Sequence, residues 1–268
     1  MNLGVRALPL AAFVTVGLLT HAAEKRWPLR AYAKSPNWLL DGVAFALGAA
    51  TQAVFQRVLE HTVYRLPGVG GFGWLTTTSQ FVQRHVPWPI AFVASAVALD
   101  CMLYFGHRLL HARALWHTHA LHHSVEELYW FGGNRASPVH VSLQYMWGAF
   151  LGLILPINGG LPAVVATTLL YVCIQHFNHA NLRWRLGPLE WLFVVPRYHF
   201  VHHGADPKLN NSNFGFLLTV WDRAFGTYTN PDRVPADFPL GLDYEHQLGR
   251  LFVGLPPALK RLGPERES

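Results

Sequence analysis

The long apolar runs of this sequence constrain its fold more than any other feature. Residues Ile90–Leu110 are apolar almost throughout, and a helix that spans a bilayer needs about 20 such residues. Four other runs, at Leu8–Thr20, Trp38–Phe55, Val139–Ile157 and Leu161–Phe177, have a similar character. The sequence therefore predicts an all-α, polytopic membrane helix bundle with about four to five spans.

Composition agrees with an embedded protein. The chain of 268 residues is 51% hydrophobic and only 13% charged, roughly half the charged share of an ordinary soluble domain. The apolar content excludes a disordered chain. A disulfide scaffold is also excluded, because Cys101 and Cys173 lie inside apolar runs without CxxC spacing. The length suits one domain or at most two small ones.

The segments between the runs predict the connections. The turn composition of residues 156–160 (PINGG) predicts a helical hairpin from the two runs beside it. Residues 59–88, with the glycine-rich PGVGGFG at 67–73, are interpreted as a loop or a re-entrant segment. The first run, with Arg6 before it and small residues after it, is either a retained span or a cleaved signal peptide.

Basic residues predict the orientation in the membrane. Lys25, Arg26, Arg30 and Lys34 crowd the loop after the first run, whereas the hairpin tip at 158–160 has no basic residue. The long C-terminal region is rich in arginine and returns to the side of that first loop, which is expected to be cytoplasmic. The net charge of +6 is interpreted as positive charge beside acidic lipid headgroups rather than as a nucleic-acid surface.

Histidine is unusually frequent, with 16 residues, most of them between His107 and His203. His107 and His111 lie four residues apart and so share one face of the helix expected at 90–111. An H-x-x-H-H unit at 119–123 repeats at 199–203, and His176 and His179 end the last apolar run. Imidazole suits iron, zinc, copper and nickel, and about eight to ten converging imidazoles exceed one tetrahedral site. The pattern predicts two metal ions.

Asp100 and Tyr104 lie on the same helical stripe as His107. An acid inside an apolar helix is costly and usually functional. Both residues are therefore interpreted as outer partners that orient a metal-bound imidazole, with a purely polar-network role for Asp100 left open. Packing or surface roles are expected for His21, His61, His85 and His246. The same roles are favoured for His117 and His140, with metal binding by His140 left open.

Three stretches of the chain resemble the fatty acid hydroxylase / sterol desaturase superfamily. They are Asp100-x3-Tyr104-x2-His107-Arg108-x2-His111 with Leu115-Trp116-x2-His119-x2-His122-His123-Ser124; His179-Ala180-Asn181 with Pro196-Arg197-Tyr198-His199-x2-His202-His203; and Asn213-Phe214-Gly215 with Trp221-Asp222-x2-Phe225-Gly226-Thr227. These stretches cover about residues 90–230, and their order and spacing make the resemblance specific.

The resemblance implies an integral-membrane, helical, non-haem di-iron oxygenase that uses O2. Its implied layout is N-terminal spans at 1–88, a catalytic domain with a cytoplasmic helical cap at 89–230, and a cytoplasmic tail at 231–268. The implied iron ligands are His107, His111, His119, His122, His123, His179, His199, His202 and His203, with His176 as the candidate for a further ligand. Many relatives have histidine where Ser137 stands here, which argues for a different substrate or a tuned site.

Membrane burial with an iron pair suggests oxidation of a lipid C–H bond, either hydroxylation or desaturation. The sequence has no GxGxxG after a strand, no flavin signature and no CxxCH, so a separate reductase, ferredoxin or cytochrome is expected to deliver electrons. One alternative is a zinc-dependent membrane hydrolase, which would need an acid such as that of HExxH. The other is a metal-binding or transport protein, whose ligands would belong at the bilayer midplane.

Overall fold

The computed structural model describes residues 3–62, 81, 84–154, 160–242 and 247–256, which form helices, loops and isolated β-bridges without a strand. The predicted all-α class is thus confirmed for the described residues. The helices are α1 (Leu3–Arg26), α2 (Trp38–His61), α4 (Trp88–Leu110), α5 (Trp116–His123), η1 (Gly132–Asn134), α6 (Pro138–Ile154), α7 (Gly160–His179), η2 (Gly187–Trp191), α8 (Pro196–His202), α9 (Pro207–Asn210), α10 (Val220–Ala224), η3 (Pro231–Arg233) and α11 (Leu248–Phe252).

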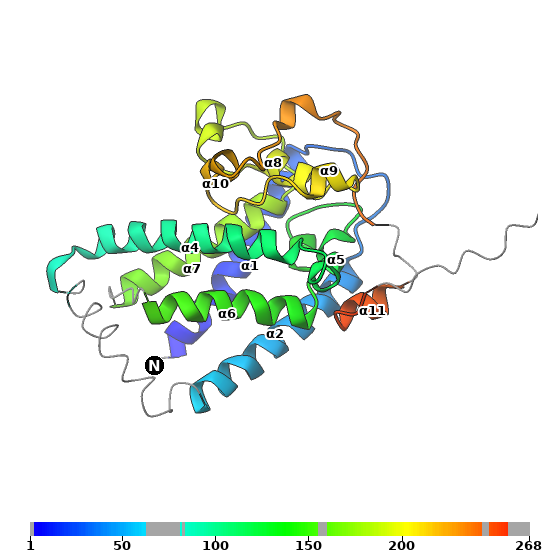
Figure 1. Cartoon of the computed structure of the whole chain (residues 1–268). Coiled ribbons are helices and arrows are strands. Elements are labelled where there is room, and N and C mark those ends of the chain that lie inside the picture. Colours follow the sequence, from blue (N-terminus) through cyan, green and yellow to red (C-terminus); the bar gives the residue numbers. More distant parts are fainter. Residues whose placement is uncertain (1–2, 63–80, 82–83, 155–159, 243–246, 257–268) are drawn as a thin grey trace, which may run out of the picture.

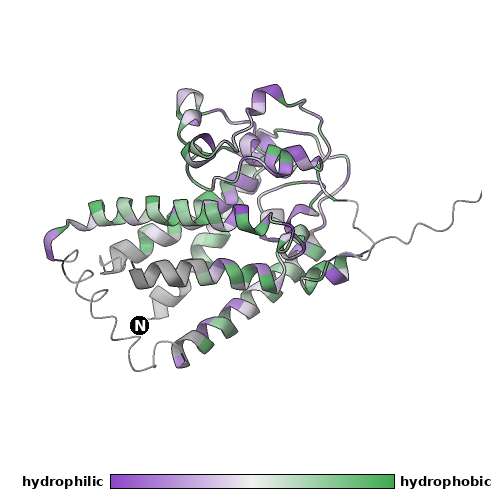
Figure 2. Ribbon diagram, viewed as in Figure 1, coloured by the Kyte–Doolittle hydropathy of each residue, from purple (hydrophilic) through white to green (hydrophobic). Residues whose placement is uncertain are grey.

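The long helices α1, α2, α4, α6 and α7 form a bundle (Figure 1). Most of the short helices lie together on one side of this bundle. Helix α1 packs against α7, while α2 and α4 both pack against α6. We call residues 116–137 and 181–242 the cap. Figure 2 shows that the described parts of α2 and α4 are mostly apolar, whereas the cap carries many polar residues.

Helices α2 and α4 contain stretches, Trp38–Val58 and Trp88–Leu110, that are long and apolar enough to cross a membrane by length and composition. Their outward faces carry large apolar side chains such as Leu39, 80% exposed, and Ile90, 61% exposed. Extended apolar surface of this kind suits lipid better than water. The expected total of four to five spans remains a prediction, and the expectations for residues 67–73 and 156–159 lie outside the described residues.

Local sequence signals position the ends of the helices that carry histidine. Helix α4 begins after Pro87 with a proline in its first turn, where the missing N–H is tolerated. It ends at Leu110, so His107 and His111 lie at its cap end. Helix α8 also begins with proline, Pro196, after the extended residue Val195. The prolines thereby define where α4 and α8 begin, and the histidines follow at or near the other end of each helix.

Buried acidic side chains fasten the cap to the bundle. Glu24, near the end of α1, accepts hydrogen bonds of 2.8 Å from the backbone N–H groups of Trp130 and Asn181. Asp41 on α2 is fully buried and pairs with the guanidinium of Arg135, and it also accepts a bond of 2.7 Å from the hydroxyl of Tyr129. Such buried charges are retained only with partners, so both acids hold the cap loop at 124–135 in place.

Candidate metal centre

Nine of the histidines expected as ligands lie in two buried groups where the bundle meets the cap. They come from the end of α4, from α5, from the end of α7 and from α8 with the residue after it. Each group offers one nitrogen per imidazole, and within a group these nitrogens lie within 4.8 Å of one another. The sequence pattern grouped these residues as one constellation, and the structure divides them.

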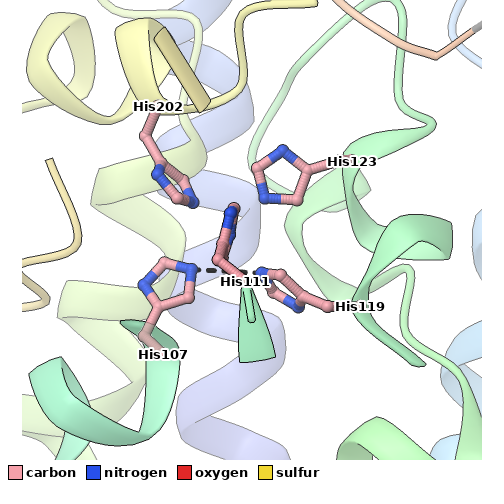
Figure 3. A group of neighbouring side chains, drawn as sticks. All are labelled: His107, His111, His119, His123 and His202. Carbon is pink, nitrogen blue, oxygen red and sulfur yellow. Dashed lines mark hydrogen bonds between the residues drawn. The ribbon is translucent and has the colours of Figure 1, made fainter. Parts of the chain in front are cut away.

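The first group, called here the five-histidine group, is drawn in Figure 3. The imidazoles point toward a common centre from α4, α5 and the α8 region, and the Nε2 atoms of His107 and His119 are 3.1 Å apart. Trp116 covers one side, with ring centroids 4.9 Å from His111 and 5.1 Å from His123. The members of this group are His107, His111, His119, His123 and His202.

The second group, called here the four-histidine group, is buried throughout. The Nε2 atom of His179 lies 3.2 Å from that of His122 and 3.0 Å from that of His199. The Nε2 atoms of His199 and His203 are 3.2 Å apart. The Nε2 atoms of all four imidazoles therefore converge on one volume.

Helical geometry explains why neighbouring histidines serve different groups. Successive residues of an α-helix point about 100° apart, whereas residues four apart lie on one face. In α5, His119 and His123 therefore share the five-histidine group and His122 joins the other. In the α8 region the assignment is reversed, because His199 and His203 join the four-histidine group while His202 joins the first. Each H-x-x-H-H unit thus contributes to both groups.

Backbone carbonyls fix the orientation of four imidazoles. In the five-histidine group, Nδ1 of His107 donates to the carbonyl of Phe214 at 3.0 Å and Nδ1 of His202 donates to that of Ser212 at 2.8 Å. In the four-histidine group, Nδ1 of His122 donates to the carbonyl of Arg135 and Nδ1 of His179 to that of Gln175. A hydrogen on Nδ1 leaves the Nε2 lone pair free, which is the arrangement of a metal-bound imidazole.

One residue with unusual backbone geometry aims two of these carbonyls. Asn213 has a positive φ of 58°, which asparagine tolerates better than most residues. Its side chain donates to the carbonyl of Thr229 at 3.0 Å and accepts from the N–H of Thr229 at 2.8 Å. The turn at Asn213 lets the carbonyls on either side of it, those of Ser212 and Phe214, both face the five-histidine group.

The chemistry of the two groups fits transition-metal ions. Several deeply buried imidazole nitrogens have no hydrogen-bond partner, and such orphaned nitrogens are rare unless they have another role. Burial lowers the pKa of the cap histidines, with mutual repulsion adding to the effect, so these imidazoles are neutral and their lone pairs are available. The residues concerned are His119, His122, His123, His199, His202 and His203.

The side chains of Asp100 and Tyr104 form hydrogen bonds with residues of the cap rather than with an imidazole. The carboxylate of Asp100 accepts hydrogen bonds from the backbone N–H groups of Leu217 and Leu218 and from Nε1 of Trp221 at 2.8 Å. The hydroxyl of Tyr104 bonds Thr227 Oγ1 at 2.8 Å. Among the described residues, neither side chain has a hydrogen bond to histidine. The expected direct contact is replaced by a link to the loop that supplies the Phe214 carbonyl.

Asp222 connects α8 to the loop at Phe214, a role that its residue type and position do not predict. It lies in one of the stretches that carry the family resemblance, but nothing in its type or spacing indicates its partners. Its two oxygens accept from the N–H groups of Phe214 and Gly215 at 2.8 and 2.7 Å, and from the hydroxyls of Tyr198 and Thr227. One buried carboxylate thereby joins α8 to the Phe214 loop.

His176 belongs to neither group. Its ring stacks on Trp130 at a centroid distance of 4.8 Å and meets Phe13 edge to face at 4.7 Å, between α1 and the cap. Its Nδ1 donates to the carbonyl of Val172, one turn earlier in α7. His140, for which packing was favoured and metal binding left open, is buried beside His119, with the two Nδ1 atoms 3.2 Å apart.

The helical bundle closes on two buried groups of imidazoles, each of which could hold a metal ion. Comparisons with known proteins agree. A sequence model of the fatty acid hydroxylase family matches residues 92–227, which contain all nine histidines of the two groups. The chain belongs to this family, and the predicted resemblance is confirmed.

Curated relatives include several lipid-modifying enzymes. The chain is 35% identical over 162 residues to ornithine lipid hydroxylase OlsE of Rhizobium tropici, covering 58% of this chain and 47% of that protein. It is 28% identical over 186 residues to an alkylglycerol monooxygenase of Xenopus tropicalis, covering 68% and 40%. It is 24% identical over 201 residues to a Delta(7)-sterol 5(6)-desaturase of Candida dubliniensis, covering 74% and 49%. The matches span at most about half the length of these relatives, and no solved structure matches.

Proposed function

We propose that this chain is a membrane-embedded di-iron oxygenase that hydroxylates a C–H bond of a lipid. The observation that carries the proposal is the pair of buried histidine groups, with nitrogens that converge within 4.8 Å in each. The similarity to ornithine lipid hydroxylase and alkylglycerol monooxygenase supports a lipid substrate and insertion of oxygen. Iron bound in both groups would supply the activation of O2.

The residues of this chain hold, orient and shield such a centre. The carbonyls of Phe214, Ser212, Arg135 and Gln175 keep the ring hydrogens of four imidazoles on Nδ1, which leaves the Nε2 lone pairs of these rings free. Burial of the imidazoles excludes bulk water, which limits side reactions and loss of metal. The balanced reaction takes a lipid C–H group, one O2, two electrons and two protons to a lipid alcohol and water. A separate reductase, ferredoxin or cytochrome supplies the electrons.

The membrane arrangement is part of the same proposal. Four to five of the apolar runs span the bilayer, and the cap lies on the cytoplasmic face. The concentration of Lys25, Arg26, Arg30 and Lys34 after α1 supports that orientation. The lipid enters sideways from the bilayer, which places its reactive carbon near the cap end of α4, where His107 and His111 lie.

Mass spectrometry of lipids tests the reaction. Cells that express the wild-type chain are compared with cells that express His202→Ala, a variant that lacks one imidazole of the five-histidine group. A lipid class that gains one oxygen only with the wild type supports hydroxylation. Loss of two hydrogens in that class indicates desaturation instead. The proposed lipid oxidation is wrong if no lipid class differs between the two strains.

Metal analysis of the purified protein separates the proposal from its alternatives. We expect about two irons per chain in the wild type. His117→Ala is the control for substitutions within the two groups, because His117 lies on α5 outside both. Stoichiometric zinc after growth in iron-rich medium, with an intact lipid profile, favours a zinc-dependent hydrolase. Transport of metal without any change in lipid favours a metal carrier.

A further inference from the structure

His119 differs from its neighbours in what holds its Nδ1 atom. Four of the nine imidazoles donate from Nδ1 to a backbone carbonyl, but Nδ1 of His119 meets a side chain, Nδ1 of His140, at 3.2 Å. The two rings meet edge to face, with centroids 4.5 Å apart. Both residues are at most 2% exposed, so no bulk water competes for the contact.

The direction of this hydrogen bond follows from the five-histidine group. Nε2 of His119 lies 3.1 Å from Nε2 of His107 and faces the centre of the group (Figure 3). An imidazole that binds metal through Nε2 carries its single ring hydrogen on Nδ1. His119 must then donate from Nδ1, so Nδ1 of His140 accepts and His140 carries its own hydrogen on Nε2.

Ser137 holds His140 in position for this task. The Ser137 hydroxyl donates to the carbonyl of Thr118 at 2.7 Å and accepts from the N–H of His140 at 3.1 Å. Ser137 thus caps the start of α6 and is bonded to α5 next to His119. Ser137 is fully buried, and its two hydrogen bonds hold the start of α6 against α5.

We infer that His140 is the positioning residue of His119. Its side chain accepts the hydrogen on Nδ1 of His119, as backbone carbonyls do for four of the other imidazoles. It holds the hydrogen of His119 on Nδ1 and so keeps the Nε2 lone pair directed at the metal of the five-histidine group. The inference rests on the proposed metal centre. His140 would be a ligand-orienting residue that lies outside both histidine groups and outside the repeated histidine units.

Titration of metal into the purified, metal-stripped protein tests the inference. His140→Leu removes the acceptor at similar volume, His140→Asn restores one through Oδ1, and His117→Leu is the control on α5. Fe(II) binding is measured by competition with a chromophoric chelator, and Co(II) binding by its visible absorption. For His140→Leu we expect affinity at one of two ions to fall about 10–100-fold, with the second ion unchanged. His140→Asn recovers most of this loss.

The outcomes separate the inference from the proposed function. If the wild type binds neither Fe(II) nor Co(II), the metal centre and the inference both fail. If the wild type binds two ions and His140→Leu binds them equally well, only the inference fails. Equal losses in His140→Leu and His140→Asn also overturn it, because they indicate packing or direct ligation instead. Helix content and elution volume verify folding, and His140→Met replaces His140→Leu if the latter does not fold.

Discussion

The two histidine groups are held by different parts of the molecule. In the five-histidine group, the carbonyls of Ser212 and Phe214, both in the cap, orient His202 in α8 and His107 in α4. In the four-histidine group, His179 is oriented by Gln175 one turn earlier in the same helix. His122 is oriented by Arg135, which in turn pairs with Asp41 on α2. The first group therefore depends on the 212–214 turn of the cap, and the second on α7 and on the Arg135–Asp41 pair that joins the cap to α2.

The largest effect is expected from a pair of adjacent substitutions that divides the groups. His202→Ala removes a ligand of the five-histidine group, and His203→Ala removes one of the four-histidine group. Each variant is expected to retain one of two irons and to lose all lipid oxidation, because the proposed reaction needs both ions. Iron content and Mössbauer spectra measure the remaining site. Identical spectra from the two variants would contradict the division, and His117→Ala supplies the unaffected control.

Crowded glycines give a second way to affect one group at a time. A Cβ at Gly133 would lie 2.2 Å from Cγ of His179, whereas a Cβ at Gly215 would lie 2.5 Å from the carbonyl of Leu218 and 3.0 Å from Asp222. Gly133→Ala is expected to displace His179 and release metal from the four-histidine group, and Gly215→Ala to weaken the other. Overpacking of this kind costs about 1–3 kcal/mol.

Thermal unfolding in detergent and metal content measure both glycine effects. Gly42→Ala is the control, because a Cβ there has no atom within 4 Å apart from its own helix and neighbours. That variant should be as stable as the wild type or slightly more stable, since alanine favours helix by up to about 1 kcal/mol. Loss of the same metal ion in Gly133→Ala and Gly215→Ala would refute separate supports.

The sequence alone predicted the helical class, the family and the histidines, because these depend on local patterns. Apolar runs of span length indicate helices, and H-x-x-H-H spacing places imidazoles on one short helix. The division between groups was not predicted, although the 100° step between His122 and His123 already implies two directions. The histidines form one set in the sequence, because the positions of α7 and α8 relative to α5 are tertiary information.

The supporting contacts were harder to predict for a physical reason. Every residue has a carbonyl, so nothing in Ser212 or Phe214 as residue types indicates an imidazole partner. Asp100 was expected to orient a histidine, but its carboxylate is occupied by the Leu217, Leu218 and Trp221 donors. His176 shares the end of α7 with His179, yet its ring turns toward Trp130 and Phe13. Such differences depend on rotation about the helix and on packing.

Asp222→Asn should weaken the five-histidine group more than the other. The carboxylate accepts from the N–H groups of Phe214 and Gly215, and an amide in its place leaves at least one buried donor without an acceptor. Such a loss costs about 1–3 kcal/mol. The resulting shift of the Phe214 carbonyl is expected to reduce iron affinity at that group about 10–100-fold. Chelator competition measures it, and an equal loss at both groups would contradict the assigned role.

The smallest effect is expected at the cap surface. Asp232 is half exposed, and hydrogen bonding from Arg197 in α8 lowers the pKa of its carboxyl. A lowered folded-state pKa means that the ion pair stabilises above the unfolded value of about 3.9 and is lost as the pH falls through the folded value. At neutral pH, Asp232→Asn should cost no more than about 1 kcal/mol, because solvent screens the pair. Arg197 keeps Glu190, so both groups should retain iron. Metal loss from either group would show that the position of α8 depends on this surface pair. The contrast between the supports of the two groups would then need revision.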